Sequence, residues 1–215
     1  MEFVLQYQNA DQQGLYLGED DAQVFGEGTL TVSSRNPLIS GSVGAMCFLI
    51  LGIGKPRRYY LWNCFRIERI TPADDTPGRL VATGAGWMLN PPQRLEGNDF
   101  DALRQACANF MTFRNISDHP YTRPLMDLAN QFRRPITDSQ TLDFCNDLVQ
   151  FAPGYPDVYK LRGICMMDLG DDAQAIEDFQ FAKQDFETLG IDDEADFCGR
   201  VIEAIRDPKN KLTEE

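Results

Sequence analysis

The chain has 215 residues, of which 43% are hydrophobic and 25% charged, and its formal net charge is −13. This length suffices for one large domain or two small ones, and we expect two. The longest uncharged apolar run, Val43 to Ile53, is far shorter than the roughly 20 residues that span a bilayer. Since the N-terminal residues also lack the basic start and apolar stretch of a signal peptide, we expect a cytoplasmic protein.

Acidic side chains are concentrated in the second part of the chain. Residues 1 to 120 carry 13 acidic and 10 basic side chains, whereas residues 121 to 215 carry 20 acidic and 10 basic ones. Affinity for a polyanion is therefore expected in the first part only.

The six cysteines form no CxxC pair and most lie in apolar segments, which indicates reduced, buried thiols. Because His119 is the single histidine, we expect no zinc site.

The first hundred residues are typical of a β-rich domain, because short alternating or apolar runs are separated by turn residues. Strands are predicted at Glu2 to Tyr7, Leu15 to Leu17, Leu30 to Ser33, Ala45 to Leu51, Arg58 to Ile70 and Leu80 to Thr83. A compact barrel or a strongly bent sheet lets such short strands bury one face and limits their open edges. We expect a barrel.

The stretch LILGIGKPRRYYLWNCFRIERI, residues 49 to 70, predicts two strands joined by a turn at Gly54 to Pro56. Strict alternation puts Asn63 on one face of the second strand with Tyr59, Leu61, Phe65 and Ile67, and Trp62 on the other with Tyr60, Cys64, Arg66 and Glu68. Tyr60 and Trp62 can stack on bases while nearby Lys55, Arg57 and Arg58 contact phosphates. The alternative is a hairpin of core aromatics with solvated arginines.

The stretch VATGAGWMLNPPQRL, residues 81 to 95, has Gly84 and Gly86 just before Trp87, and Asn90 before two prolines. Glycine is used where the backbone turns sharply or where a ligand comes close. Trp87 and Asn90 can then provide a stacking surface and an amide at the mouth of a barrel, as in sites that hold flipped bases. The alternative is a glycine bulge that lets Trp87 fill the core.

From residue 99 onward the apolar period becomes helical. Helices are predicted at Asp99 to Phe113, from about Pro124 to Phe132, and at Thr141 to Phe151, with a linker before the last of these. We therefore expect an α+β protein with a barrel domain and flanking helices over residues 1 to 133. An all-α domain is expected over residues 134 to 215.

The clearest pattern lies in PDVYKLRGICMMDLGDDAQAIEDFQFAKQ, residues 156 to 184. Large and small residues fall at the spacing of a tetratricopeptide helix pair, which this stretch resembles: Tyr159, Gly163, Gly170, Ala175, Phe179 and Ala182. The small residues let the two helices approach, Gly170 ends the first helix, and Phe179 packs between them. The preceding helix resembles part of a degenerate repeat, and residues 192 to 205 predict a capping helix. This resemblance implies protein docking, for which we expect Tyr159, Arg162 and Met166.

The two β-rich stretches, taken in their order, resemble an N-terminal domain that accompanies HNH-type nucleases in some bacterial proteins. That domain is a small barrel of the PUA-like group, which includes EVE and ASCH domains, and the resemblance covers roughly residues 1 to 130. It implies nucleic-acid binding, with Tyr60, Trp62, Trp87 and Asn90 in a pocket for a modified base and Lys55, Arg57 and Arg58 on phosphate. No HNH nuclease follows in this chain; an acidic helical repeat takes its place.

No residue pattern predicts catalysis. The chain has no P-loop, because proline follows Lys55 where a hydroxyl residue is required, and none of its acidic clusters has the EF-hand pattern. A turn position explains His119 better than pairing with Cys107 or Ser117 does. We therefore expect a non-catalytic binding protein without metal or cofactor, whose barrel recognises nucleic acid or a modified nucleobase and whose helices dock a protein partner. The rival hypothesis is a protein-interaction adaptor that uses its acidic helices alone.

Overall fold

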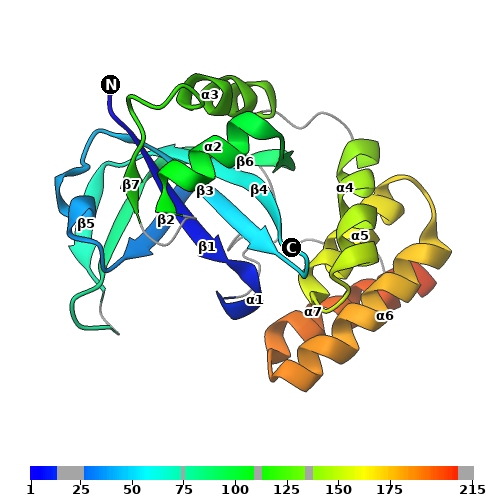
Figure 1. The fold of residues 1–215 in the computed structure, drawn as a ribbon. Coiled ribbons are helices and arrows are strands. Elements are labelled where there is room, and N and C mark those ends of the chain that lie inside the picture. The colour runs from blue at the N-terminus through cyan, green and yellow to red at the C-terminus, as the bar shows by residue number, and fades with distance from the viewer. Residues whose placement is uncertain (14–26, 74–75, 109–112, 134–137, 208–215) are drawn as a thin grey trace. The chain divides into compact units, whose positions relative to one another are not determined.

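The computed structural model describes residues 1–13, 27–73, 76–108, 113–133 and 138–207 of an α+β protein (Figure 1). The chain divides into two compact units, Met1–Ile136 and Thr137–Glu215. Within the described ranges, every strand belongs to the first unit, and the second unit contains helices only. The strand predicted at Leu15 to Leu17 lies outside the described residues.

The first unit is built on one mixed sheet, in which seven strands are described: β1 (Phe3–Asn9), β2 (Glu27–Ser34), β3 (Met46–Ile53), β4 (Arg58–Arg66), β5 (Arg69–Pro72), β6 (Leu80–Leu95) and β7 (Arg114–Asn115). Their order is β2-β6-β4-β3-β1-β7, with β5 beside β6. The pair of β1 and β3 is parallel, and the other described pairs are antiparallel.

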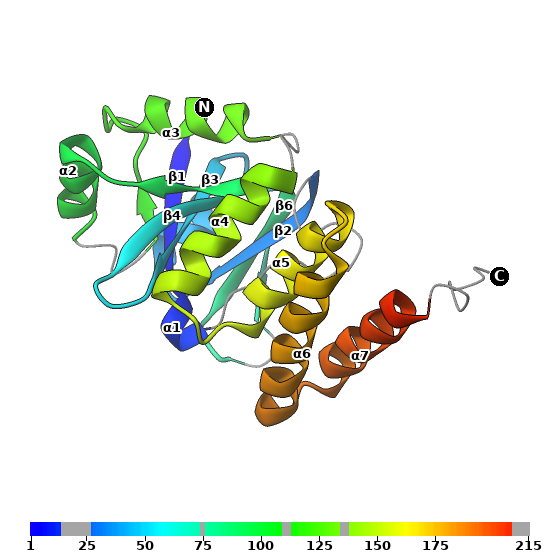
Figure 2. The same ribbon diagram turned by 90° about the vertical axis from the view of Figure 1, so that its right-hand side faces the viewer.

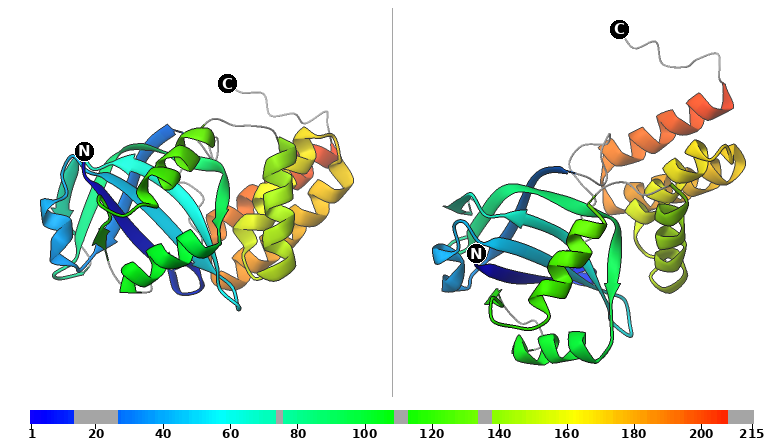
Figure 3. Two further views of the ribbon diagram at one scale, coloured as in Figure 1. Left: turned by 45° about the horizontal axis from the view of Figure 1, so that its top comes forward. Right: turned by 90° about the horizontal axis from the view of Figure 1, so that it is seen from above.

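The predicted closed barrel is wrong, because the described sheet is curved but open (Figure 3). Its end strands β2 and β7 share no ladder in the described part of the chain. A side-chain bond links the segments next to them instead, since Asn36 Nδ2 donates to the Phe113 carbonyl at 2.9 Å. With only two residues, β7 is too short to pair with β2 and close a barrel. The described sheet is therefore bent but open.

Helices cover one face of this sheet. Helices α2 (Asn98–Ala106) and α3 (Thr122–Gln131) lie on the same side of it, as Figures 1 and 3 show. The core between them and the strands includes Leu5, Phe48, Ile50, Leu61, Cys64 and Trp87 of the sheet, with Phe100, Leu103, Leu125 and Ala129 of the helices. The remaining helical segments of this unit are short, namely α1 (Ala10–Gln13) and the 3-10 helix η1 (Pro37–Gly41).

A bulge at Trp62 overturns the strict alternation predicted for β4. In the ladder with β3, Leu61 pairs with Ile50 and Asn63 with Leu49, which leaves Trp62 as an extra residue. In the ladder with β6, the partners jump from Gln93 to Met88 at the same point. The bulge shifts the side-chain phase by one residue, so Cys64 joins Leu61 in the core under the helices, and Asn63 faces away from it.

Gly84 and Gly86 are required by the close approach of β6 to β4. A Cβ atom at Gly84 would lie 1.8 Å from the Arg66 carbonyl oxygen, and one at Gly86 would lie 2.2 Å from Phe65 Cβ. Real Cβ atoms do not come so near other heavy atoms, so a larger residue would force the strands apart. Of the two roles that glycine can have in this stretch, the structure supports backbone packing.

The second unit is a succession of four described helices: α4 (Asp138–Phe151), α5 (Pro156–Asp168), α6 (Asp172–Leu189) and α7 (Asp192–Arg206) (Figure 2). Gly163 of α5 faces Phe179 of α6 so closely that an added Cβ would lie 3.1 Å from the ring. Gly170 follows α5 with a φ of +83°, and the Asp171 side chain caps α6 by accepting from the Gln174 amide. The predicted packing of Gly163 against Phe179 and the predicted end of the first helix at Gly170 are confirmed. None of the helices within the described ranges has the length and apolar character needed to cross a membrane.

All six cysteines are buried, and none of them is in a disulfide bond. Burial raises the pKa of the Cys47 and Cys145 thiols well above the ordinary value, and it raises the pKa of the Cys198 thiol to about 12. At pH 8 a raised pKa leaves less thiolate, which is the reactive form.

We therefore expect the native protein to react with a disulfide reagent at pH 8 at least about 100-fold more slowly than the urea-unfolded protein. Absorbance of the released thiol, followed over time, measures this ratio. A native thiol that reacts as fast as those of the unfolded chain would contradict the burial of that cysteine.

Candidate functional site

The predicted basic hairpin between β3 and β4 is partly neutralised. Arg57 forms an ion pair with Asp11 at 3.0 Å and donates to the Tyr7 hydroxyl at 2.9 Å. The other oxygen of the Asp11 carboxylate accepts from the Gly54 amide at 3.0 Å, which ties the turn to α1. Lys55 is exposed, and Arg58 is half-buried. The guanidinium of Arg57 is therefore engaged within the protein, where the resemblance implies a phosphate contact.

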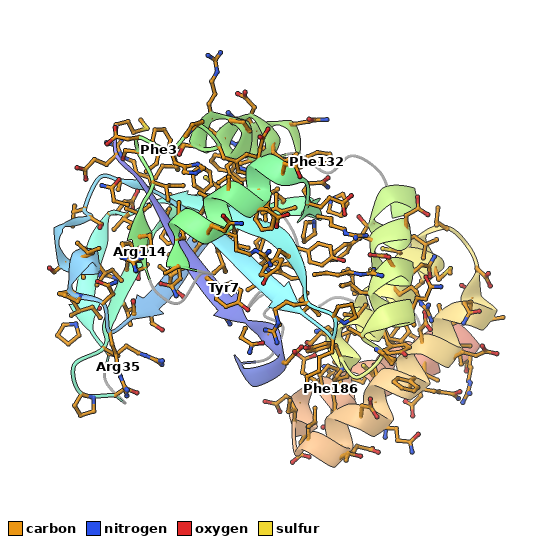
Figure 4. The ribbon with its side chains drawn as sticks, in the orientation of Figure 1. Phe3, Tyr7, Arg35, Arg114, Phe132 and Phe186 are labelled. Carbon is orange, nitrogen blue, oxygen red and sulfur yellow. The ribbon has the colours of Figure 1, made fainter. Side chains whose placement is uncertain are left out.

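Tyr7 lies at the centre of this arrangement, on β1 (Figure 4). Gly52 of β3 makes room for it, because a Cβ at that position would lie 2.5 Å from the Tyr7 hydroxyl oxygen. Burial raises the pKa of Tyr7, and the hydrogen bond from Arg57 partly offsets this shift. The cluster of Tyr7, Asp11 and Arg57 fixes the hairpin to the first strand, which is a structural role.

Trp87 lies in the core of the sheet unit, which agrees with the alternative prediction that it fills the core. Its side chain is 6% exposed, and its Nε1 donates to the Ala129 carbonyl of α3 at 2.8 Å. The guanidinium carbon of Arg133 lies 4.5 Å from the centre of its ring. Trp87 thus anchors α3 to the sheet, and its 6% exposure leaves almost no surface for a base.

Tyr60 and Trp62, which were also predicted for the base pocket, do not gather around Trp87. Tyr60 is 2% exposed and Trp62 is 1% exposed, so neither ring offers a surface on which a base can stack. The side chain of Asn90 lies outside the part that the structure describes. Trp62 contributes to a different feature, on the face of the sheet opposite to α2 and α3, so Tyr60, Trp62 and Trp87 do not meet in one pocket.

That feature is a trough with a volume of about 420 Å³, which falls within the roughly 300 to 1,000 Å³ of small-molecule sites. It is lined by Gln8 of β1, residues 29 to 33 of β2, Leu49 and Leu51 of β3, Trp62 and Asn63 of β4, and Val81 of β6. Curvature of the sheet brings β2 toward β1 and β3, with which it shares no ladder among the described residues.

The floor of the trough is formed at the bulge of β4. Bulges re-aim side chains, and this one places Trp62 and Asn63 together on the trough. Asn63 is 5% exposed, and its Oδ1 atom has no hydrogen-bond partner among the described residues. An unpaired buried carbonyl is costly, so it marks a position where a bound molecule can supply the missing donor.

The trough is chemically neutral. Its described lining combines apolar side chains with the amides of Gln8 and Asn63 and the hydroxyls of Thr29, Thr31 and Ser33, and it includes no ionisable group. Uncharged amides and hydroxyls beside apolar side chains suit a flat, uncharged heterocycle. Within this lining, Trp62 alone was predicted. Asn63 was missed, although an amide inside the apolar run YYLWNCF was a visible signal.

The predicted partner residues of the helical unit are used internally. The Tyr159 ring is 8% exposed and lies 4.0 Å, centre to centre, from the ring of Phe181. Arg162 forms two hydrogen bonds to the carboxylate of Asp178, at 2.6 and 2.7 Å. Met166 is half-buried and packs against the core between the helices. The more exposed large apolar side chains of this unit are Met167, Leu169, Phe181, Leu189 and Ile191.

The side chain of the single histidine accepts a hydrogen bond from the backbone of its own turn. His119 is half-buried, and its Nδ1 accepts a hydrogen bond from the Tyr121 amide at 3.1 Å, just before α3. Across the described ranges, no group of three or more histidine, cysteine, aspartate or glutamate side chains is positioned to hold a metal ion.

Comparison with family models, with curated proteins and with solved structures finds no match to this chain.

Proposed function

We propose that the protein is a non-catalytic, two-unit binding protein of the cytoplasm. Its sheet unit recognises nucleic acid by accepting one base, modified or unmodified, in the trough. Its helical unit is a tetratricopeptide-like module that docks a protein partner. The single observation that carries the proposal for the sheet unit is the buried, unpaired Asn63 carbonyl beside Trp62 in a trough large enough for a ligand.

The charge of the sheet unit sets how a nucleic acid would bind. Residues 1 to 136 carry 14 acidic and 13 basic side chains, so the unit as a whole attracts a polyanion weakly. Because Arg57 is paired with Asp11, the exposed Lys55 is the cation of the hairpin best suited to a phosphate contact. Base recognition therefore dominates this proposal, and binding depends on salt less steeply than in proteins with many phosphate contacts.

We expect Trp62→Leu to weaken oligonucleotide binding at least about fivefold, because Trp62 is the 1% exposed floor of the trough and a smaller side chain lets that floor collapse. Trp87→Phe is the matched control, since Trp87 lies on the opposite face, and its affinity should stay within about twofold of the wild type. Fluorescence anisotropy with a panel of modified and unmodified labelled oligonucleotides measures both. Absence of binding at low salt, or unchanged affinity in Trp62→Leu, contradicts the proposal.

The charge of the helical unit favours a second candidate, an adaptor that binds protein only. Residues 137 to 207 carry 17 acidic and 5 basic side chains, so a basic partner fits them best. Packing of α5 on α6 through Gly163 and Phe179 supports a tetratricopeptide-like unit. The two candidates differ in whether the sheet unit binds nucleic acid at all, so the oligonucleotide titration separates them.

A further inference from the structure

The unpaired amide oxygen of Asn63 determines which ligands the trough can accept. Asn63 sits on β4, the central one of the five strands that line the trough, and it is more than nine-tenths buried. In the register of the sheet it pairs with Leu49 on one side and Met88 on the other, so its nearest cross-strand side chains are apolar. Neither neighbour can donate a hydrogen bond to it.

The protein would gain stability by losing this carbonyl. A buried acceptor without a donor keeps its full desolvation cost, and an apolar side chain of similar shape removes that cost. Leucine is close to asparagine in shape and suits the neighbouring Leu49 and Met88. Asn63 therefore destabilises the empty protein. A hydrogen bond to a ligand in the trough would explain why asparagine stands at this position.

The lining also excludes charged ligands. An anion in the trough would lose its hydration without gaining a cation, because no lysine, arginine or histidine is among its described lining residues. A neutral ring loses little on transfer and gains contact with the partly exposed lining residues Leu30 and Val81. A ring that carries an N–H group in its plane can in addition donate to Asn63 Oδ1.

We propose that the trough selects a neutral, planar heterocycle by an N–H group that donates to Asn63 Oδ1, and that any phosphate attached to the ligand stays outside. This inference rests on the proposed function in taking that ring to be a nucleobase. It goes further by assigning the selection to one hydrogen bond. Bases whose N–H groups are methylated are rejected, and bases that retain them are bound.

Matched nucleoside pairs test the hydrogen bond directly in the full-length protein: uridine with 3-methyluridine, adenosine with N6,N6-dimethyladenosine, and cytidine with N4,N4-dimethylcytidine. Calorimetric titration of the wild type should show at least one parent nucleoside that binds at least about tenfold more tightly than its methylated form. In Asn63→Leu, the parent should bind at least about tenfold more weakly than in the wild type, and the preference for it should disappear.

Loss of the preference in Asn63→Leu distinguishes a hydrogen bond from a steric effect of the methyl group, which would persist. Asn63→Leu should also unfold at a higher urea concentration than the wild type, so weak binding cannot be assigned to misfolding. Persistent discrimination in Asn63→Leu, unchanged affinity for the parent, or no binding of any nucleoside by the wild type would overturn the inference. Nucleoside binding that depends on Asn63 without any oligonucleotide binding would overturn the nucleic-acid proposal and leave this inference standing.

Discussion

Replacing Arg162 with methionine is expected to lower the free energy of unfolding by about 3 to 5 kcal/mol, because it leaves a buried carboxylate without its partner. Asp178 is 3% exposed and accepts two hydrogen bonds from the Arg162 guanidinium. The hydrogen bond to Asp178 also raises the pKa of Arg162, so the arginine stays charged under all ordinary conditions. Urea unfolding of the full chain, followed by circular dichroism at the helical minimum, measures the loss.

The double variant Arg162→Met/Asp178→Leu is the control for this prediction. Replacement of both members of a buried ion pair by apolar residues is often neutral or stabilising, so the double variant should recover at least half of the lost stability. If Arg162→Met alone loses less than about 1 kcal/mol, the pair behaves as a surface salt bridge. The buried geometry described for Asp178 would then be incorrect.

The second large effect is expected at Gly86, where alanine should destabilise the sheet unit by about 3 kcal/mol or prevent its folding. An added Cβ would lie 2.2 Å from Phe65 Cβ and 2.3 Å from the Cys64 carbonyl oxygen, so β4 and β6 must separate. The strain acts on the two strands that hold Trp62, Asn63 and Trp87. Urea unfolding monitored by tryptophan fluorescence reports on this part of the chain.

Gly28 provides a matched control, because it is the β2 partner of Gly86 in the same ladder. A Cβ at Gly28 meets no heavy atom within 4 Å, so Gly28→Ala should leave the free energy of unfolding unchanged or raise it by less than about 1 kcal/mol. Equal effects of alanine at the two positions would show that the approach of β6 to β4 is looser than described.

Local patterns predicted most of the described secondary structure. Turn residues at Gly54 to Pro56 separate β3 from β4, and helical spacing of apolar residues identified α2 and the helices from α4 onward. In the helical unit, the small residue Gly163 and the left-handed Gly170 have the roles expected from the repeat pattern. Each of these features depends on residues that are near one another in the sequence, which is why the sequence reveals them.

Features that depend on distant strands were not predicted. The bulge at Trp62 arises from simultaneous pairing of β4 with β3 and β6, and it reverses the faces assigned to Asn63 and Cys64. The trough needs the curvature that brings β2 toward β1, which no local pattern encodes. Strict alternation assumes a regular ladder, so it fails wherever a ladder contains an extra residue.

The aromatic residues illustrate a related limit. Trp62 and Trp87 are both largely buried, yet they lie on opposite faces of the sheet. Composition cannot distinguish an aromatic residue that seals a core from one that lines a pocket. The distinction comes from partners: Trp87 Nε1 is satisfied by Ala129, whereas Asn63 beside Trp62 has an oxygen that no described residue satisfies.

Tryptophan emission of the Trp87→Phe protein tests the central claim most directly. The chain has two tryptophans, so Trp62 alone remains in this variant and its emission reports occupancy of the trough. On titration with the parent nucleosides, we expect a saturable change in emission with at least one of them, and no such change in Trp87→Phe/Asn63→Leu over the same concentrations. Emission that stays constant with every nucleoside, or that saturates equally with leucine at position 63, would contradict recognition of a ring by Asn63 in the trough above Trp62.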